Sequence, residues 1–229
     1  MLLIIIVGFM IVSFAVSSTL KRKFKKYSQI PLNANLSGAQ AAELMLVDYG
    51  IRDVRIVSVP GQLTDHYNPA TKTVNLSEEV YHGRNAAAVA VATHECGHAV
   101  QHATAYSMLE MRSALVPLQN VSARIINIIF IAMFVGAFAL PQIIPFNLAL
   151  IVIISCYAIF TLFAVVTLPV EFDASKRALS WVQERGIVTD REHWMAKDAL
   201  KWAAMTYVVA ALSSLVMLLY YLSLLTGND

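Results

Sequence analysis

Residues 85–102 read NAAAVAVATHECGHAVQH, and this stretch is the most informative part of the sequence about fold and function. Asn85 is a good N-cap, and the alanine- and valine-rich residues after it predict a long helix to about residue 105. Residues four apart project from the same face of a helix, so His94 and His98 can share one metal ion. Glu95 then lies beside the open coordination position, where a carboxylate can accept a proton from water.

The pattern His-Glu-x-x-His on a helix is typical of zinc hydrolases, and two imidazoles with a carboxylate favour zinc as the cofactor. The alternative is that His94, Glu95 and His98 are ordinary polar residues on a buried helix. That arrangement would cost several kcal/mol unless the side chains were satisfied. Gly97, which has no side chain, permits close packing against this helix.

A third protein ligand is needed, and Glu171 is the preferred candidate. It follows an apolar run and Pro169 and is expected to open a new helix, where a carboxylate would also suit the helix dipole. His102 lies about 12 Å along the helix axis from His94, which is too far for one ion to bridge easily. The remaining histidines are expected to be solvated or core residues: His66, His82 and His193.

Four apolar runs are each about long enough to span a bilayer, and they divide the chain. The first carries no basic residue before it and five after it, which favours an uncleaved anchor over a signal peptide. The second and third are separated by an uncharged break at residues 141–145. The expected segments are a membrane anchor at 1–20, a soluble lobe at 27–120, a membrane hairpin at 125–168, polar helices at 169–201 and a last span at 202–226.

All 17 Lys and Arg residues fall within residues 21–26, 52–124 and 176–201. Four spans place these regions on one side of a membrane, and the other side then carries no Lys or Arg. The positive-inside rule predicts that the basic side, with the metal-binding helix, is cytoplasmic. We therefore expect a multi-pass protein of the cell membrane.

The soluble lobe reads as mixed helix and strand. Ser37 and Gln40 match a capping box for a helix that ends near Gly50. Residues 54–59 and 71–76 read as strands. The second is either an edge strand beside the metal site, which could bind an extended peptide, or an ordinary strand of the sheet. The predicted fold class is a mainly α membrane protein with about four transmembrane helices and a zincin-like α+β lobe, whose small sheet packs on the metal-binding helix.

Composition excludes several other classes of protein. The chain is 58% hydrophobic and 14% charged, well below the charge content of a soluble domain. No basic stripe with interleaved aromatic residues indicates nucleic acid. Two cysteines, Cys96 and Cys156, make no disulfide framework. The apolar runs hold essentially no charge, which argues against a transporter or channel.

The four spans, together with HECGHAVQH at 94–102 and PVEFDAS at 169–175, resemble the YugP-type family of bacterial neutral zinc metallopeptidases. The resemblance extends to DHYNP at 65–69 and NLS at 75–77. It implies a gluzincin-like site with His94, His98 and Glu171 on zinc and Glu95 as general base.

A more distant similarity is to the HtpX and CAAX-processing membrane peptidases, which carry a Glu-x-x-x-Asp second motif. Here Glu171 matches its ligand position, but Ser175 stands where the Asp is expected. Either Asp173 or Ser175 could orient a histidine in its place.

The expected activity is hydrolysis of peptide bonds in a peptide or membrane-protein substrate at the cytoplasmic membrane face. The alternative is a non-catalytic membrane protein with a structural zinc site, which a fourth ligand would favour. Neither the physiological substrate nor the oligomeric state follows from the sequence. Several residues could stabilise an oxyanion, and the sequence does not choose among them: His66, Tyr67, Tyr106, Arg177 and His193.

Overall fold

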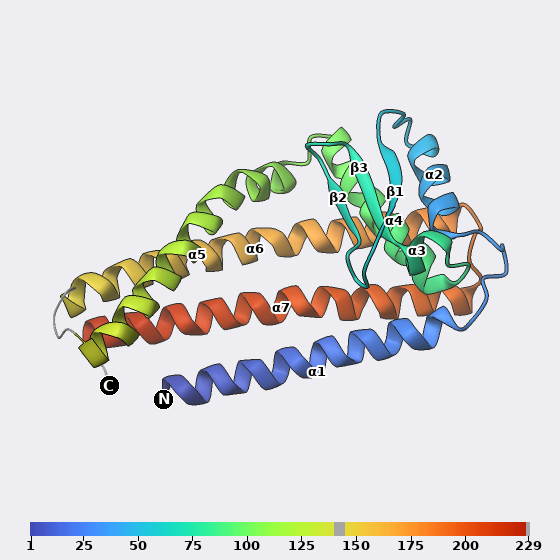
Figure 1. Ribbon diagram of the computed structural model, residues 1–229. Coiled ribbons are helices and arrows are strands. Elements are labelled where there is room, and N and C mark those ends of the chain that lie inside the picture. Colours follow the sequence, from blue (N-terminus) through green and yellow to red (C-terminus); the bar gives the residue numbers. More distant parts are fainter. Residues whose placement is uncertain (140–144, 228–229) are drawn as a thin grey trace. The chain divides into compact units, whose positions relative to one another are not determined.

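The computed structural model describes the backbone of residues 1–139 and 145–227, and the side chains of residues 1–132 and 145–227 (Figure 1). Within these residues the helices are α1 (Leu2–Ser28), α2 (Gly38–Asp48), α3 (Glu78–His82), α4 (Ala86–Ala103), α5 (Ser107–Ala139), α6 (Phe146–Glu184) and α7 (Asp190–Thr226). The strands are β1 (Arg55–Val59), β2 (His66–Asn68) and β3 (Thr73–Ser77). The break predicted at residues 141–145 lies, apart from Pro145, outside the described residues.

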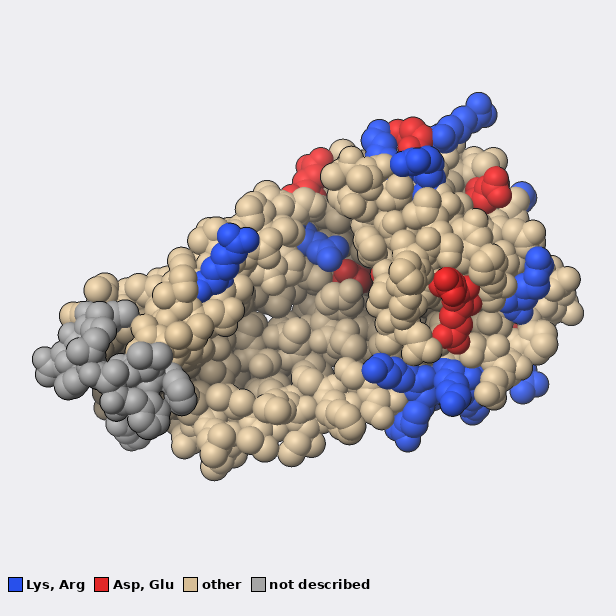
Figure 2. Space-filling model, viewed as in Figure 1, with Lys and Arg blue, Asp and Glu red and all other residues tan. Residues whose placement is uncertain are grey.

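Two compact units divide the chain, and each is assembled from separated stretches. The first unit comprises Met1–Ser13, Met111–Leu168 and the residues from Tyr207 onward. The second comprises Phe14–Glu110 and Pro169–Thr206, so it contains the sheet and the helix with the histidine motif. Figure 2 shows Lys, Arg, Asp and Glu gathered mainly over the elements of the second unit.

Four helices among the described residues are long and apolar enough to cross a membrane: α1, α5 as far as Ala132, α6 and α7. This confirms the predicted mainly helical fold with four candidate spans. The first unit has its own small core, in which Ile126, Leu150, Ile153 and Met217 are buried. Many other large apolar side chains of these helices are exposed, as expected for surfaces that contact lipid.

The expectation that Glu171 opens a new helix after Pro169 is wrong. The α6 helix continues through Pro169 to Glu184, so Glu171 lies inside a long helix and not at a helix start. Proline removes one backbone hydrogen bond, to the carbonyl four residues earlier, but the remaining turns of a long, well-packed helix can absorb that loss. A favourable interaction with a helix dipole therefore does not explain why position 171 carries a carboxylate.

The sheet has three strands in the order β1-β3-β2. The β1 strand is parallel to β3, and the short β2 strand is antiparallel to β3 with Tyr67 opposite Val74. Because β3 is paired on both sides, the edge-strand interpretation of residues 71–76 is wrong and the alternative, an ordinary strand of the sheet, is confirmed. The strand missing from the prediction, β2, has only three residues, too few to show a periodic pattern.

Helix capping in the second unit follows the sequence closely. The Ser37 side chain accepts a hydrogen bond from the backbone N–H of Gln40, and the Gln40 side chain accepts one from the Ser37 N–H. At the start of α4, Asn85 Oδ1 accepts from the backbone N–H of Ala88 at 2.9 Å. A polar contact also joins α1 to α7 within this unit. Near the end of α1, Lys23 Nζ and the Tyr27 hydroxyl lie 2.7 and 2.5 Å from the carboxylate of Asp198 on α7.

Candidate metal centre

The α4 helix presents the two motif histidines on one face. His94 and His98 are one turn apart, and their ring centroids are 4.8 Å from each other. Most of the remaining α4 surface is covered by other elements, since almost every residue from Ala86 to Gln101 is buried. The intervening Cys96 faces away, with its Sγ 3.6 Å from the Ala42 carbonyl oxygen, and burial raises the pKa of its thiol.

Gly97 lets α6 approach α4 at this point. A Cβ atom at position 97 would lie 2.7 Å from the carbonyl oxygen of Ala174 and 3.0 Å from its Cα. Because these are backbone atoms of a helix, a side chain here would push the two helices apart. The absence of a side chain therefore sets how closely the next turn of α6, with Glu171, lies to the histidines.

Glu171 completes a cluster with the histidine pair. Its Oε2 lies 3.3 Å from Nε2 of His94 and 3.7 Å from Nε2 of His98. One ligand atom from each of the three residues lies within 4.8 Å of the others. Glu171 and His98 are buried, with 2% and 7% of their surfaces exposed.

This donor set fits a zinc ion. Ligands about 2.0–2.1 Å from a tetrahedral zinc are separated from each other by roughly 3.3 Å, and the two nitrogen–oxygen distances in the cluster are 3.3 and 3.7 Å. Two imidazole nitrogens and one carboxylate are also the ligand set of one group of catalytic zinc sites. Within the described part of the chain, no other His, Cys, Asp or Glu joins this cluster.

The electrostatics of the cluster favour a bound cation. Burial lowers the pKa of His98, but hydrogen bonding to Glu171 and the charges of Glu95 and Glu171 outweigh this and raise it above the usual value. The imidazole is thus in a field that stabilises positive charge, and a metal cation can supply that charge in place of a proton.

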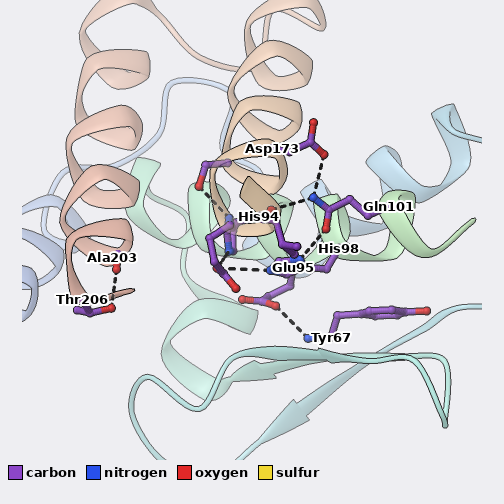
Figure 3. Close-up of polar contacts among 11 residues, drawn as sticks. Tyr67, His94, Glu95, His98, Gln101, Asp173, Ala203 and Thr206 are labelled. Carbon is purple, nitrogen blue, oxygen red and sulfur yellow. Dashed lines mark hydrogen bonds and ion pairs between the residues drawn. The ribbon is translucent and has the colours of Figure 1, made fainter. Parts of the chain in front are cut away.

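Glu95 is held by the sheet. The backbone N–H of Tyr67, at the middle of β2, donates to Glu95 Oε2 at 2.9 Å (Figure 3). No hydrogen bond within the described residues involves Oε1 of Glu95. The β2 strand is tied in turn to the end of β3, because Asp65 accepts from the backbone N–H and the hydroxyl of Ser77 at 2.7 and 3.0 Å.

Both histidines also make a hydrogen bond through Nδ1, the ring nitrogen away from Glu171. Ser175 Oγ lies 3.1 Å from Nδ1 of His94, so the serine that replaces the expected Asp reaches that histidine itself. Asp173 does not contact either histidine. Its Oδ2 accepts from Gln101 Nε2 at 2.8 Å and from Arg177 Nε at 2.6 Å.

Sequence reasoning did not identify Gln101 or the backbone N–H of Tyr67 as parts of the site. Gln101 lies three residues after His98, and helical spacing alone places the two on one face. The Tyr67 contact has no comparable signal, because it depends on where a three-residue strand lies against α4.

The remaining candidates lie outside the ligand cluster. His102 Nδ1 is 2.8 Å from the Tyr67 hydroxyl, and His66 Nδ1 is 2.8 Å from the Thr64 carbonyl oxygen. The Arg177 guanidinium lies over the ring of Tyr106, 5.9 Å from its centroid.

Comparison with known proteins places the chain among metallopeptidases. The family described as "Putative neutral zinc metallopeptidase" matches residues 2–226. The chain is 37% identical over 219 residues to "Putative membrane protease YugP" of Bacillus subtilis, covering 95% of this chain and 93% of the relative. No solved structure matches it. Because the family covers nearly the whole chain, including both helices of the site, the protein belongs to this family of neutral zinc metallopeptidases.

Proposed function

We propose that the protein is a membrane-bound zinc endopeptidase in which His94, His98 and Glu171 bind the metal and Glu95 is the general base. The observation that carries this proposal is the convergence of three ligand atoms within 4.8 Å, from two helices that are far apart in the sequence. The family and the relative named above support the same activity.

Zinc bound by these residues would supply Lewis acidity, polarising a substrate carbonyl and lowering the pKa of water. Glu95 would take the proton through Oε1, since its Oε2 accepts from the Tyr67 N–H. The same carboxylate can then pass that proton to the leaving amine.

An extended substrate chain fits best along β2. This strand is an edge of the sheet, and its backbone already contacts the general base at Tyr67. Peptides commonly bind by adding a strand to such an edge. The expectation of an edge-bound peptide is therefore kept, but it moves from residues 71–76 to β2.

A position near the cytoplasmic membrane face is part of the proposal. Glu171 lies three residues after the apolar run that ends at Leu168, or about 4.5 Å along α6. The proposed segments are an anchor at 1–20, a lobe at 27–120, a hairpin at 125–168, polar helices at 169–201 and a span at 202–226. The proposed partners are a peptide or membrane-protein substrate and the lipid bilayer, with no nucleic acid.

The cluster argues against a purely structural zinc site. Structural zinc is usually closed by four protein ligands, often cysteines. Here three ligands are joined by a carboxylate in the position of a base, and the described residues offer no fourth ligand in the cluster. Such a set leaves a coordination position for water or substrate.

The test measures bound zinc and peptide cleavage in purified wild type, Glu95→Gln and Glu171→Ala, in detergent or lipid. Exposed Glu43→Gln on α2 is the matched control and should behave as wild type. Glu95→Gln should keep its zinc and lose about 10²- to 10⁴-fold in cleavage rate, whereas Glu171→Ala should lose both. Full zinc binding by Glu171→Ala would exclude this ligand set. Unchanged cleavage by Glu95→Gln would exclude the proposed base.

A further inference from the structure

Gln101 is a fully buried amide next to the metal centre, and the proposed mechanism does not use it. Its Oε1 lies 3.0 Å from Nδ1 of His98. Its Nε2 lies 2.8 Å from the carbonyl oxygen of Val170 and 2.8 Å from Oδ2 of Asp173. Figure 3 shows Gln101 between His98 and Asp173. Both polar atoms of the amide are therefore hydrogen-bonded.

The partners of Gln101 fix which end of the amide faces the histidine. A backbone carbonyl and an ionised carboxylate can only accept hydrogen bonds, so the group facing Val170 and Asp173 has to be the NH₂. A flipped amide would place its oxygen against two acceptors and lose both bonds. The oxygen end of Gln101 must therefore face His98.

The orientation of the amide decides the tautomer of His98. An amide oxygen has no proton to donate, so Nδ1 of His98 has to be the donor. In the neutral imidazole the lone pair is then on Nε2, the nitrogen that lies 3.7 Å from Oε2 of Glu171. Gln101 thus leaves free the nitrogen that faces the metal position.

Asp173 is itself held from its other side, which keeps the Gln101 donor end in place. Arg177 Nε donates to Oδ2 of Asp173 at 2.6 Å, four residues further along α6. A charged guanidinium donates a strong hydrogen bond to a carboxylate oxygen and so fixes where this carboxylate lies. The chain of contacts therefore runs from His98 through Gln101 and Asp173 to Arg177.

His94 lacks an equivalent constraint. The Ser175 hydroxyl, 3.1 Å from Nδ1 of His94, can rotate and either donate or accept. This contact can support either tautomer of His94, so the two metal-facing histidines are held in different ways.

We propose that Gln101 is a positioning residue that, with Asp173, holds His98 in the Nδ1-protonated tautomer and so keeps its Nε2 available for the metal. The metal's identity rests on the proposed function, but the tautomer does not. The two ideas can therefore fail separately.

The first measurement needs no substitution. Wild-type protein labelled with ¹⁵N-histidine is studied by NMR metal-free, over rising pH until the His98 ring carries a single proton, and again after addition of zinc. A His98→Ala sample assigns the signals. His98 should carry its proton on Nδ1 in both states, and an Nε2-protonated ring in the metal-free protein would overturn the proposal. Failure to bind zinc would instead refute the proposed function. The metal-free sample would still give the tautomer of His98 and so would still test the role of Gln101.

The second measurement is zinc affinity by competition with a chelating dye. Gln101→Leu should bind zinc about 10- to 100-fold more weakly, the usual cost of removing a partner of a metal-bound histidine. Thr104→Val is the matched control, because its hydroxyl bonds only to carbonyl oxygens at the end of α4. Wild-type affinity in folded Gln101→Leu would overturn the proposal.

A charge exchange tests the donor end of the amide. Gln101→Glu keeps an acceptor for His98 but places a second carboxylate against Asp173, so zinc affinity should fall as in Gln101→Leu. Adding Asp173→Asn supplies an NH₂ to that carboxylate and should recover part of the loss, because the Val170 carbonyl oxygen still faces a carboxylate oxygen. The two carboxylates of Gln101→Glu would repel each other whatever the role of Gln101, so this exchange tests the orientation of the amide, and the NMR measurement tests its role. Full affinity in Gln101→Glu alone, or no recovery in the double variant, would refute the assigned orientation.

Discussion

Substitution of Gly97 by alanine tests whether close approach of two helices sets the metal geometry. The new Cβ would lie 2.7 Å from the Ala174 carbonyl oxygen, whereas ordinary van der Waals contacts begin near 3.4 Å. The α6 helix would thus have to retreat by roughly 0.7 Å at that point. Carried to the adjacent turn, this displacement would widen the 3.3 Å gap between His94 and Glu171 toward 4 Å.

Two opposing terms enter the stability of Gly97→Ala. Alanine is about 1 kcal/mol better than glycine inside a helix, while overpacking a core contact costs about 1–3 kcal/mol. The net expectation is a loss of about 0–2 kcal/mol. Zinc affinity should fall by at least about tenfold, similar to the loss when the support of a ligand is removed.

Thermal unfolding and zinc competition measure both quantities on the same preparations. Gly8→Ala is the matched control, because Gly8 is also inside a helix and a Cβ atom added there would meet nothing within 4 Å. It gains the same helix propensity without a steric cost. A Gly97→Ala protein that is more stable than wild type and binds zinc equally tightly would refute the packing argument.

Three further changes test other parts of the second unit. Nδ1 of His94 lies 3.1 Å from the Ser175 hydroxyl, and Ser175→Asp would give it an acidic partner instead. Zinc competition should then show up to about tenfold tighter binding. Weaker binding would mean that this turn of α6 cannot hold a carboxylate there. Burial raises the pKa of Asp65 above 3.8, despite its bonds to Ser77, so the folded protein binds that proton more tightly than the unfolded chain. The free energy of unfolding should therefore decline as pH rises from the pKa of Asp65 in the unfolded chain through its pKa in the folded protein. Denaturant titrations of Asp65→Asn should show a weaker dependence of this free energy on pH. An unchanged dependence would contradict the assignment to Asp65. Ser37→Ala removes the N-cap of α2 and should cost about 1 kcal/mol in the same titrations, whereas no loss would show that the capping box adds nothing.

The parts of the fold that the sequence predicted are those with local causes. The capping box at Ser37 and the N-cap at Asn85 are determined by residues three positions away. The four apolar helices follow from length and composition. Close packing against α4 at Gly97 was predicted from the missing side chain, but the sequence did not show that α6 is the element that approaches.

The parts that were missed depend on contacts between distant segments. Pro169 reads as a helix end, yet the helix carries on, because local propensity is overridden by the turns on either side. The β2 strand exists through its pairing with β3 and through the contact of Tyr67 with Glu95, neither of which leaves a periodic pattern. Three ligands could be named from the motif and the family resemblance, whereas Gln101 became visible only with its partners on α6.

The long separation between the histidine pair and Glu171 has a consequence for protein synthesis. Roughly 70 residues lie between His98 and Glu171, including α5 and the apolar run of α6. At about 5–20 residues per second, a ribosome takes roughly 4–15 s to make them. During that interval the nascent chain carries His94, His98 and the proposed base Glu95 but lacks Glu171, the proposed third ligand. The proposed metal centre is therefore incomplete until three of the four apolar segments have been translated, so the proposed activity would begin only after most of the candidate spans exist.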